Sequence, residues 1–376
     1  GLPVLSAQAG YIPSSLMFIA CWLFMLCTGL LLLEANLWFK EDVHVVSLAD
    51  RTLGKLGKSI SWFVFAFLFY SLMVAYVTGS DELFIDFFEA FFAISLPHWL
   101  GGLAMIMLFA LMIYMGTGAV DKLNRLLMLG LLLTYVLLIM MGNSHIETKL
   151  LEHQDWSAGY LVIPAMIVSF GFHNLIPSLA HYLGKDSQRL KTSLIIGSFI
   201  PLVIYLLWQR LILGIVPLEG QGSLEAAWNE GQMATHALKT AVGGSWIVDI
   251  AQFFAFFAIV TSFLGVSLSF VDFLADGLGI PKKGFGKVLL CALALLPPYI
   301  FSLIYPGAFL MALNYAGGFG AVIIFGILPA LMVWSGRYNK GLKGPQFIPG
   351  GKIMLVLVML CSLGVLLLQV YQTINY

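Results

Sequence analysis

The sequence contains little charge for its length. Charged residues make up 10% of its 376 positions, whereas hydrophobic residues make up 60%. Because soluble domains carry roughly a quarter of their residues as charges, this chain has too few to cover a water-facing surface. The formal net charge is zero, which gives no basis for binding nucleic acid. We therefore expect an integral membrane protein.

The sequence also lacks the motifs of common pumps and membrane enzymes. It contains no Walker sequence, no HExxH, no GxSxG and no CxxC pair. Its four cysteines lie in apolar stretches, away from histidines at metal-ligand spacing, and are typical of small buried hydrophobes: Cys21, Cys27, Cys291 and Cys361. We expect neither an ATP-driven pump nor an enzyme, and no metal or organic cofactor.

Long apolar runs fill most of the chain. A helix needs about 20 apolar residues to cross a bilayer, and the runs predict spans at 14–39, 59–88, 99–117, 123–142, 159–184, 190–216, 246–274, 286–304, 308–335 and 352–373. Residues 1–12 are too short to span alone, and we expect them to complete a helix whose first half is missing, which makes about eleven. Residues 42–58 predict a short interfacial helix, and 217–245 the longest polar loop.

Lysine and arginine alternate between successive loops. If residues 1–12 end the first helix, the loops after even-numbered helices hold all but three of the 19 basic residues. The exceptions are Lys149, Lys239 and Arg210, of which Arg210 is expected to snorkel from the seventh helix. Basic loops stay in the cytoplasm, so the loops carrying Lys55, Lys122, Arg189, Lys283 and Lys340 are predicted to share the cytoplasmic face.

Polar residues gather in the middle of the span 159–184. The run Ser169-Phe170-Gly171-Phe172-His173-Asn174 lies between Pro164 and Pro177. Glycine and proline weaken a helix, and polar groups at membrane depth are costly unless they face protein, water or substrate. We predict a break in this helix within 168–174 that exposes a polar site. A proline-kinked helix bonded to its neighbours is the alternative.

Further polar residues lie in other spans. Tyr70 and Tyr76 could line a cavity or pack as interfacial aromatics, and the adjacent acids Asp81 and Glu82 could mark an outer mouth. Thr261 and Ser262 could serve a cation or a helix–helix hydrogen bond. Glu34, in the inner third of its span, could carry a proton or pair with a lysine or arginine at the cytoplasmic end. Asp272 and Asp276 lie near the inner end of the span 246–274, and Asp272 is a further proton candidate.

These residues resemble the bacterial tyrosine and tryptophan permeases, an aromatic amino acid permease family within the amino acid–polyamine–organocation superfamily. The resemblance covers essentially the whole chain and looks closest to the tyrosine branch. Its most specific part is Ser169-Phe170-Gly171-Phe172-His173. It also rests on Gly1-Leu2-Pro3, Leu31-Leu32-Leu33-Glu34, Ala75-Tyr76 with Gly79, Pro177-Ser178, Trp208-Gln209, Thr261-Ser262-Phe263-Leu264-Gly265, Asp272 with Asp276, and Met311-Ala312-Leu313 with Tyr315-Ala316-Gly317.

The resemblance implies a leucine-transporter-type fold of two inverted five-helix repeats, with helices one and six broken. It places the first repeat at 1–142, incomplete at its start, the second at 159–335, and an extra helix at 352–373, all in one transmembrane domain. It also implies proton-driven uptake of an aromatic amino acid, most of all tyrosine, across the inner membrane. The chain departs from the pattern at Asn174, where glycine is usual, and at Asp81 and Arg210, where uncharged residues are usual.

Two kinds of candidate residue follow. Those expected to bind substrate are Gly1, Leu2, Tyr70, Tyr76, Ser169, Phe170, Gly171, Phe172, His173 and Asn174. Those expected to couple an ion or proton are His173, Thr261, Ser262, Glu34, Glu82 and Asp272. The expected partners are the substrate and membrane lipid, with the oligomeric state open. A sodium symporter remains an alternative, and a non-transporting sensor or scaffold would instead have an intact helix six.

Overall fold

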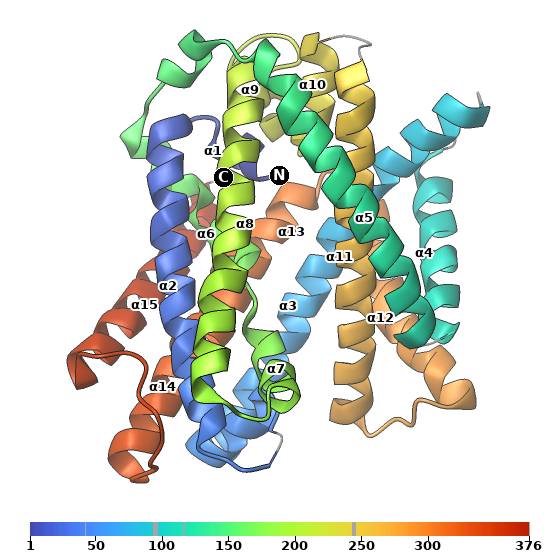
Figure 1. The fold of residues 1–376 in the computed structure, drawn as a ribbon. Helices are drawn as coiled ribbons and strands as arrows, with labels where there is room; N and C mark the ends of the chain where they lie inside the picture. Colours follow the sequence, from blue (N-terminus) through green and yellow to red (C-terminus); the bar gives the residue numbers. More distant parts are fainter. Residues whose placement is uncertain (42, 93–96, 116, 243–245, 376) are drawn as a thin grey trace. The chain divides into compact units, whose positions relative to one another are not determined.

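The computed structural model describes residues 1–376 except 42, 93–96, 116, 243–245 and 376. At residues 81–83, 86–92, 98, 104–105, 108, 113, 117, 119 and 242 it describes the backbone alone. Within these described residues the regular structure is helical and contains no β-strand (Figure 1). The predicted all-α fold is confirmed.

The α-helices are α1 (Leu2–Ser6), α2 (Tyr11–Leu37), α3 (Val45–Phe92), α4 (His98–Met115), α5 (Thr117–Gly142), α6 (Ile163–Ser169), α7 (Ile176–Tyr182), α8 (Ser187–Ile215), α9 (Leu224–Asn229), α10 (Ala234–Val242), α11 (Trp246–Leu278), α12 (Gly284–Ile304), α13 (Phe309–Tyr315), α14 (Leu328–Trp334) and α15 (Gly351–Asn375). Short 3₁₀ helices are η1 (Asn143–His145), η2 (Thr148–Glu152), η3 (Trp156–Val162) and η4 (His173–Leu175), and π-helical segments are η5 (Ala316–Ile327) and η6 (Ser335–Asn339).

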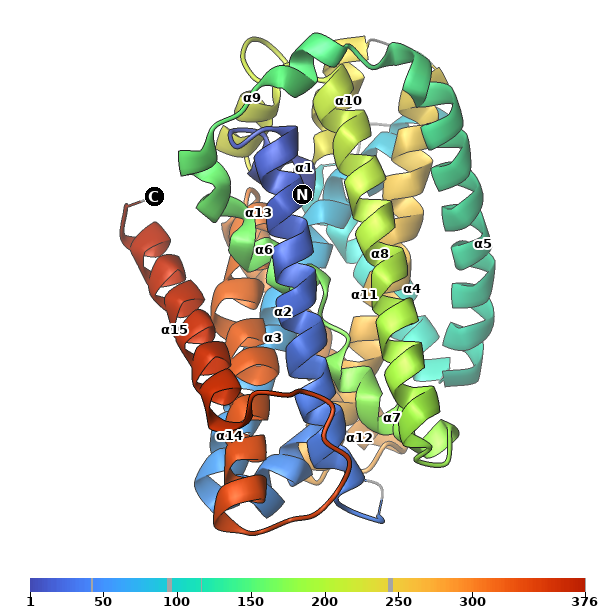
Figure 2. The same ribbon diagram turned by 60° about the vertical axis from the view of Figure 1, so that its left-hand side comes forward.

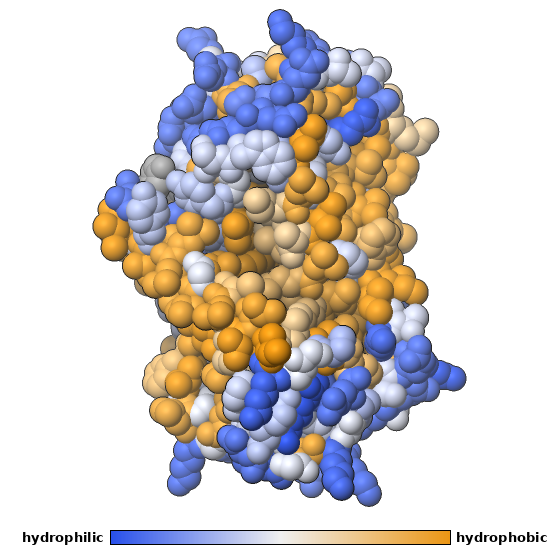
Figure 3. All heavy atoms as spheres, turned by 90° about the vertical axis from the view of Figure 1, so that its left-hand side faces the viewer, coloured by the Kyte–Doolittle hydropathy of each residue, from blue (hydrophilic) through white to orange (hydrophobic). Residues whose placement is uncertain are grey.

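Nine candidate membrane spans, each long and apolar enough to cross a bilayer, lie in the described part of the chain. They overlap nine of the ten predicted spans. The tenth, 99–117, overlaps α4, a helix of 18 residues. In the face that Figure 3 shows, hydrophobic side chains cover the middle and hydrophilic ones gather at the ends, as lipid contact requires. The chain is therefore a multi-pass membrane protein.

The chain divides into two compact units. Unit 1 comprises Gly1–Tyr11, Phe69–Gln154 and Trp208–Leu313, and unit 2 comprises Ile12–Leu68, Asp155–Leu207 and Asn314–Tyr376. Each unit takes segments from both predicted repeats, and boundaries between the units fall inside α3, α8 and α13, after the first residue of α2, and between η2 and η3. The two units are described separately.

In unit 1, α5 and α11 run side by side (Figure 1). The Phe257 ring packs where a side chain at Gly130 would stand, 2.7 Å from the position of a Cβ atom there. The Tyr299 hydroxyl on α12 donates to the Trp99 carbonyl on α4 at 2.7 Å. Contacts of these two kinds hold membrane helices together: glycine allows close approach, and interhelical hydrogen bonds add to the packing. They matter because the hydrophobic effect does little to drive association between helices that already lie in lipid.

In unit 2, the glycine-rich segment η5 packs closely on its neighbours. A Cβ atom at Gly317 would lie 1.7 Å from the Pro164 carbonyl oxygen of α6, and one at Gly318 would lie 2.3 Å from Gln369 of α15. Figure 2 shows α15 beside this part of the chain. The sequence predicts an ordinary helix over 308–335, whereas residues 316–327 are π-helical. Four glycines in the segment, Gly317, Gly318, Gly320 and Gly326, allow this close approach.

Two of the segments between the predicted spans contain helices. Residues 45–53 form a helix that continues into the rest of α3 across a kink at Gly54, where φ is 79° and ψ is −167°. Glycine adopts such a conformation without steric cost, so the predicted short helix before this span is present. The predicted polar loop 217–245 contains α9 and α10, because Ser223 caps α9 at the Ala226 amide and Leu224 and Leu238 are buried.

Candidate functional site

The predicted break in helix six is present. α6 ends at Ser169, Gly171 and Phe172 lie outside regular structure, and α7 begins at Ile176 after the short turn η4. The prediction of lost α-helix within 168–174 is confirmed. The intact helix expected of a sensor or scaffold is not found.

The two prolines begin the half-helices instead of kinking a continuous one. Pro164 and Pro177 each stand in the first turn, of α6 and α7 respectively. Proline fits there because the missing N–H would have no partner within the helix. At the break, the Ser169 carbonyl accepts a hydrogen bond from the Tyr205 hydroxyl of α8 at 3.0 Å. The two prolines and the hydrogen bond from Tyr205 therefore stabilise the interruption of this helix.

His173 is the most enclosed polar residue of the break. Its side chain is fully buried, and Nε2 lies 2.9 Å from the Thr28 hydroxyl of α2. The rings of Phe172 and Phe325 lie nearly parallel to the imidazole, at centroid distances of 5.0 Å and 4.6 Å. Nδ1 is buried and has no hydrogen-bond partner among the described residues.

The neighbouring candidate side chains differ in how deeply they are buried. Phe170 is 3% exposed and packs edge-on against Phe18 and Tyr205, at centroid distances of 6.4 Å and 5.4 Å. Phe172 is only half-buried, and its ring stands 2.7 Å from where a Cβ of Gly29 would be. Asn174 is exposed. Of the two phenylalanines, Phe172 is therefore the one that a substrate could reach.

Ser169 and Gly171 contribute mainly backbone. The Ser169 hydroxyl donates to the Ala165 carbonyl within its own helix at 2.7 Å. At Gly171, a Cβ atom would stand 3.0 Å from the Phe325 ring. A side chain at position 171 would therefore press on the ring that stacks against His173.

Glu34 forms a buried ion pair with Arg337 of η6. Both oxygens of its carboxylate accept hydrogen bonds from the guanidinium, from Nε at 2.6 Å and from Nη2 at 2.5 Å. The side chains are 0% and 6% exposed respectively. A two-point arginine–carboxylate pair of this kind is geometrically specific and strong. The carboxylate that the sequence offers as a proton site is thus held as one half of a salt bridge.

In unit 1, Tyr70 has a structural partner. Its hydroxyl donates to the Leu293 carbonyl of α12 at 2.9 Å, and its ring packs edge-on against Phe270 at 4.7 Å. Leu293 stands four residues before Pro297, which has no N–H to return to that carbonyl. Tyr70 therefore satisfies a carbonyl that a proline leaves free.

The remaining hydroxyl candidates in unit 1 also have hydrogen bonds. Tyr76 shares one with Ser262 of α11. The Thr261 hydroxyl donates to the Phe257 carbonyl at 2.7 Å. Tyr76 and Ser262, predicted separately as substrate and ion candidates, are thus neighbours.

Helix α1 carries the first two candidates. Gly1 and Leu2 are half-buried. The Gln209 side chain of α8 donates to the Ser6 hydroxyl, which in turn donates to the Leu2 carbonyl at 2.9 Å. Gln209 is fully buried, so this short helix is fastened to unit 1 through a buried amide.

Two acidic candidates remain. Asp272 is 44% exposed and forms an ion pair with Lys282 at 2.9 Å. Glu82 is among the residues whose side chains are not described. The predicted substrate-binding residues divide between the units, with Gly1, Leu2, Tyr70 and Tyr76 in unit 1 and residues 169–174 in unit 2. Their roles stay predictions.

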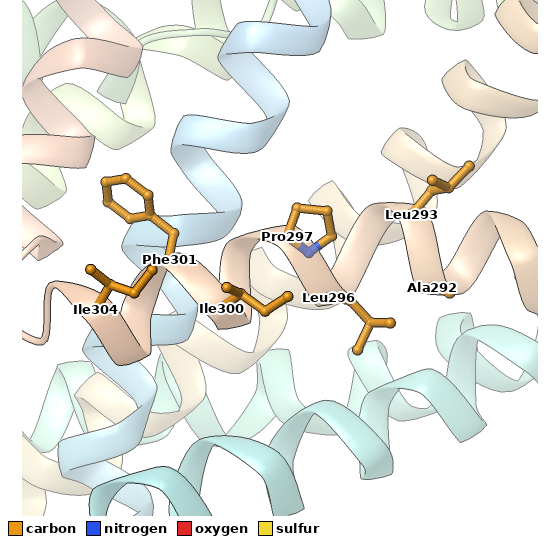
Figure 4. Close-up of a pocket in the computed structure, with 7 residues that line it drawn as sticks. All are labelled: Ala292, Leu293, Leu296, Pro297, Ile300, Phe301 and Ile304. Carbon is orange, nitrogen blue, oxygen red and sulfur yellow. The ribbon is translucent and has the colours of Figure 1, made fainter.

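An apolar groove of about 420 Å³ lies on α12 in unit 1 (Figure 4). Its lining consists of Ala292, Leu293, Leu296, Pro297, Ile300, Phe301 and Ile304. None of the candidate residues lines it, and it presents hydrocarbon only. We assign it no role in the site.

Sequence reasoning missed the partners that organise the site. Thr28, Phe325 and Tyr205 contact the broken helix from three other helical segments. A hydroxyl in an otherwise apolar run could have marked Thr28, since such groups need a partner in a membrane. Nothing in the sequence distinguishes Phe325 among the 29 phenylalanines.

A discontinuous helix at the candidate site, among membrane spans, is typical of membrane transport proteins. The chain matches the tryptophan/tyrosine permease family over residues 1–369, and it belongs to that family. It is a permease and not an enzyme.

Three relatives span nearly the whole chain. A tryptophan-specific transport protein of Pseudomonas aeruginosa is 32% identical, over 96% of this chain and 87% of the relative. A tryptophan-specific transport protein of Haemophilus influenzae is 30% identical, over 100% of this chain and 92% of the relative. The tyrosine-specific transport system 1 of the same organism is 30% identical, over 98% and 91%.

Proposed function

We propose that this permease imports an aromatic amino acid, coupled to protons, across a bacterial inner membrane. Family membership supports a carrier, and the relatives named for tryptophan and tyrosine support an aromatic substrate. Tyrosine is our first choice within this class, on the resemblance of the sequence motifs to the tyrosine branch, and tryptophan is the other candidate. The basic loops would face the cytoplasm, and the helices would form two inverted five-helix repeats with α15 added.

The observation that carries the proposal is the aromatic and polar lining of the broken helix. Phe172 offers a half-buried ring and His173 a buried imidazole, side by side where the helix is interrupted. An aromatic substrate ring would gain about 0.5–1.5 kcal/mol from pairing with such a ring beyond its area burial. Because Phe170 and Tyr70 are engaged inside their own units, we place the substrate ring against Phe172.

Proton coupling is proposed through His173, since an imidazole can bind and release a proton and this one takes part in no ion pair among the described residues. Glu34 and Asp272 are each paired with a basic residue. The sodium alternative would use Thr261 and Ser262, because hydroxyl oxygens have lone pairs that can coordinate a cation.

Uptake by membrane vesicles tests both parts. Labelled tyrosine, tryptophan and phenylalanine would be supplied with a proton gradient or a sodium gradient imposed separately. Accumulation of an aromatic amino acid under the proton gradient alone is expected. Accumulation only with sodium would replace the coupling ion, and no uptake of any of the three would overturn the proposed substrate class.

His173→Gln separates binding from coupling, because glutamine keeps hydrogen bonding but does not titrate in this range. If His173 carries the proton, driven accumulation should fail while exchange of internal for external substrate continues. If it only contacts substrate, the half-saturating concentration should change and accumulation should persist. Wild-type behaviour in both assays would make His173 a structural residue.

A further inference from the structure

The hydrogen bonds of Thr28 decide which nitrogen of His173 carries the proton. Besides its contact with Nε2, the Thr28 hydroxyl lies 3.2 Å from the Met25 carbonyl oxygen, and a carbonyl can only accept. Both contacts are hydrogen bonds at once only if the hydroxyl donates its single proton to Met25, and we assign the His173 tautomer on that basis. Thr28 must then accept from Nε2–H, so Nδ1 is left as a bare lone pair, buried and without a partner among the described residues.

A buried acceptor without a donor is uncommon in proteins and calls for an explanation. The Phe172 and Phe325 rings flank the imidazole, so its surroundings are aromatic. An ammonium group would lose its hydration there without a counter-charge, which is costly. An aromatic ring with a polar hydrogen on its edge could pack among these rings and donate that hydrogen to Nδ1. Phe172, half-buried and outside regular helix, is the side chain that would move to admit this ring and then pack against it.

We infer that Thr28 is a specificity-determining residue, which holds His173 so that Nδ1 accepts a hydrogen bond from the ring N–H of tryptophan or the ring O–H of tyrosine. This inference rests on the aromatic substrate of the proposed function and deepens it. It does not rest on proton coupling through His173, because a doubly protonated imidazole donates from both nitrogens and could not accept at Nδ1. Phenylalanine has no such hydrogen, so the site discriminates against it by one hydrogen bond. Removing a partner that a buried polar group needs is the strongest way in which a binding site rejects an analogue.

The loss of Thr28 should affect the substrates unequally. Thr28→Val keeps the shape of the side chain but removes the acceptor for Nε2–H, so the imidazole is free to carry its proton on Nδ1. The indole N–H can only donate and would then meet another donor, whereas a phenol oxygen can also accept. Tryptophan affinity should fall about tenfold, the size of one ordinary hydrogen bond, and tyrosine affinity only about two- to threefold. Phenylalanine affinity should stay the same.

The experiment is isothermal titration of the purified full chain in detergent with the three amino acids. Thr28→Ser restores a hydroxyl and should return the wild-type affinity ratios. The matched control is Thr134→Val in α5, because the Thr134 hydroxyl bonds to the Gly130 and Leu131 carbonyls of its own helix. It should leave all three affinities unchanged. Equal losses for all three amino acids in Thr28→Val, or no loss, would overturn the inference.

A second measurement does not depend on a variant that folds. Benzothienylalanine replaces the indole N–H of tryptophan with sulfur and keeps the ring shape. It should bind the wild-type protein about tenfold more weakly than tryptophan. Equal binding of the two would overturn the inference while leaving the proposed function in place. Failure of the wild-type protein to bind any aromatic amino acid would instead overturn the proposed function, and the inference with it.

Discussion

Breaking the Glu34–Arg337 pair should destabilise the protein strongly. Glu34→Leu would leave the Arg337 guanidinium, 6% exposed, without its carboxylate. Removing one partner of a buried salt bridge typically costs about 3–5 kcal/mol, because the remaining charge stays buried and uncompensated. Arg337→Leu should cost a similar amount. The double variant should cost far less than the sum, because replacing both charges by apolar side chains is often nearly neutral.

The assay is reversible unfolding in mixed micelles, with the four proteins of this double-mutant cycle compared under one condition. Glu41→Gln is the matched control, because Glu41 pairs with Arg51 at the exposed surface, where its side chain is 72% exposed. The hydrogen bond from Arg51 lowers the pKa of Glu41. That pair is therefore ionised at neutral pH, and any stability it gives is lost only as pH falls through the lowered pKa. The control should show no measurable change.

Two results would refute this reasoning. Single variants as stable as the wild-type protein would show that the pair contributes nothing to the fold. A stable Glu34→Leu protein that exchanges substrate but cannot accumulate it would show that Glu34 carries the coupled proton. In that case the salt bridge would be one state of a working proton site and not a fixed contact.

Two further substitutions test the packing of the units. Gly317→Ala places a Cβ atom against the Pro164 carbonyl oxygen and should destabilise the protein by at least about 1–3 kcal/mol. The control is Gly364→Ala on α15, where a Cβ atom meets nothing within 4 Å and stability should change by no more than about 1 kcal/mol. Equal effects in thermal unfolding would contradict the close packing of η5 on α6. Tyr70→Phe removes the hydrogen bond to Leu293 and should cost about 1 kcal/mol without changing substrate preference; a changed preference in competition uptake would return Tyr70 to the substrate site.

The spans and the break could be predicted from the sequence, because both depend on local composition. An apolar run of about 20 residues has few folds open to it in a bilayer. Likewise, Gly171 between two prolines and among polar side chains disfavours continuous helix wherever it stands. The role of the two prolines, however, could be assigned only from the structure, which places each of them in the first turn of a helix. Position within a turn decides whether proline starts a helix or breaks one, and composition does not fix that position.

The contacts that give the site its chemistry could not be predicted, because they join distant parts of the chain. Thr28 and His173 are 145 residues apart, and Glu34 and Arg337 are 303 apart. From sequence, each of these residues is a polar group in need of a partner, with several partners of the right kind available. Glu34 illustrates the consequence, since the carboxylate alone suggests a proton site and the guanidinium beside it indicates a structural pair.

The close contacts made by the glycines of η5 could not be predicted from the sequence either. A glycine in a membrane helix indicates that something approaches closely, yet the four in this segment face different neighbours. Gly317 meets the start of the broken helix, whereas Gly318 and Gly326 meet α15. The first of these contacts fixes the half of the broken helix that precedes His173, and Phe325 of the same segment stacks on the imidazole itself. A segment with no polar side chain therefore sets the position of the polar residue on which the proposed chemistry depends.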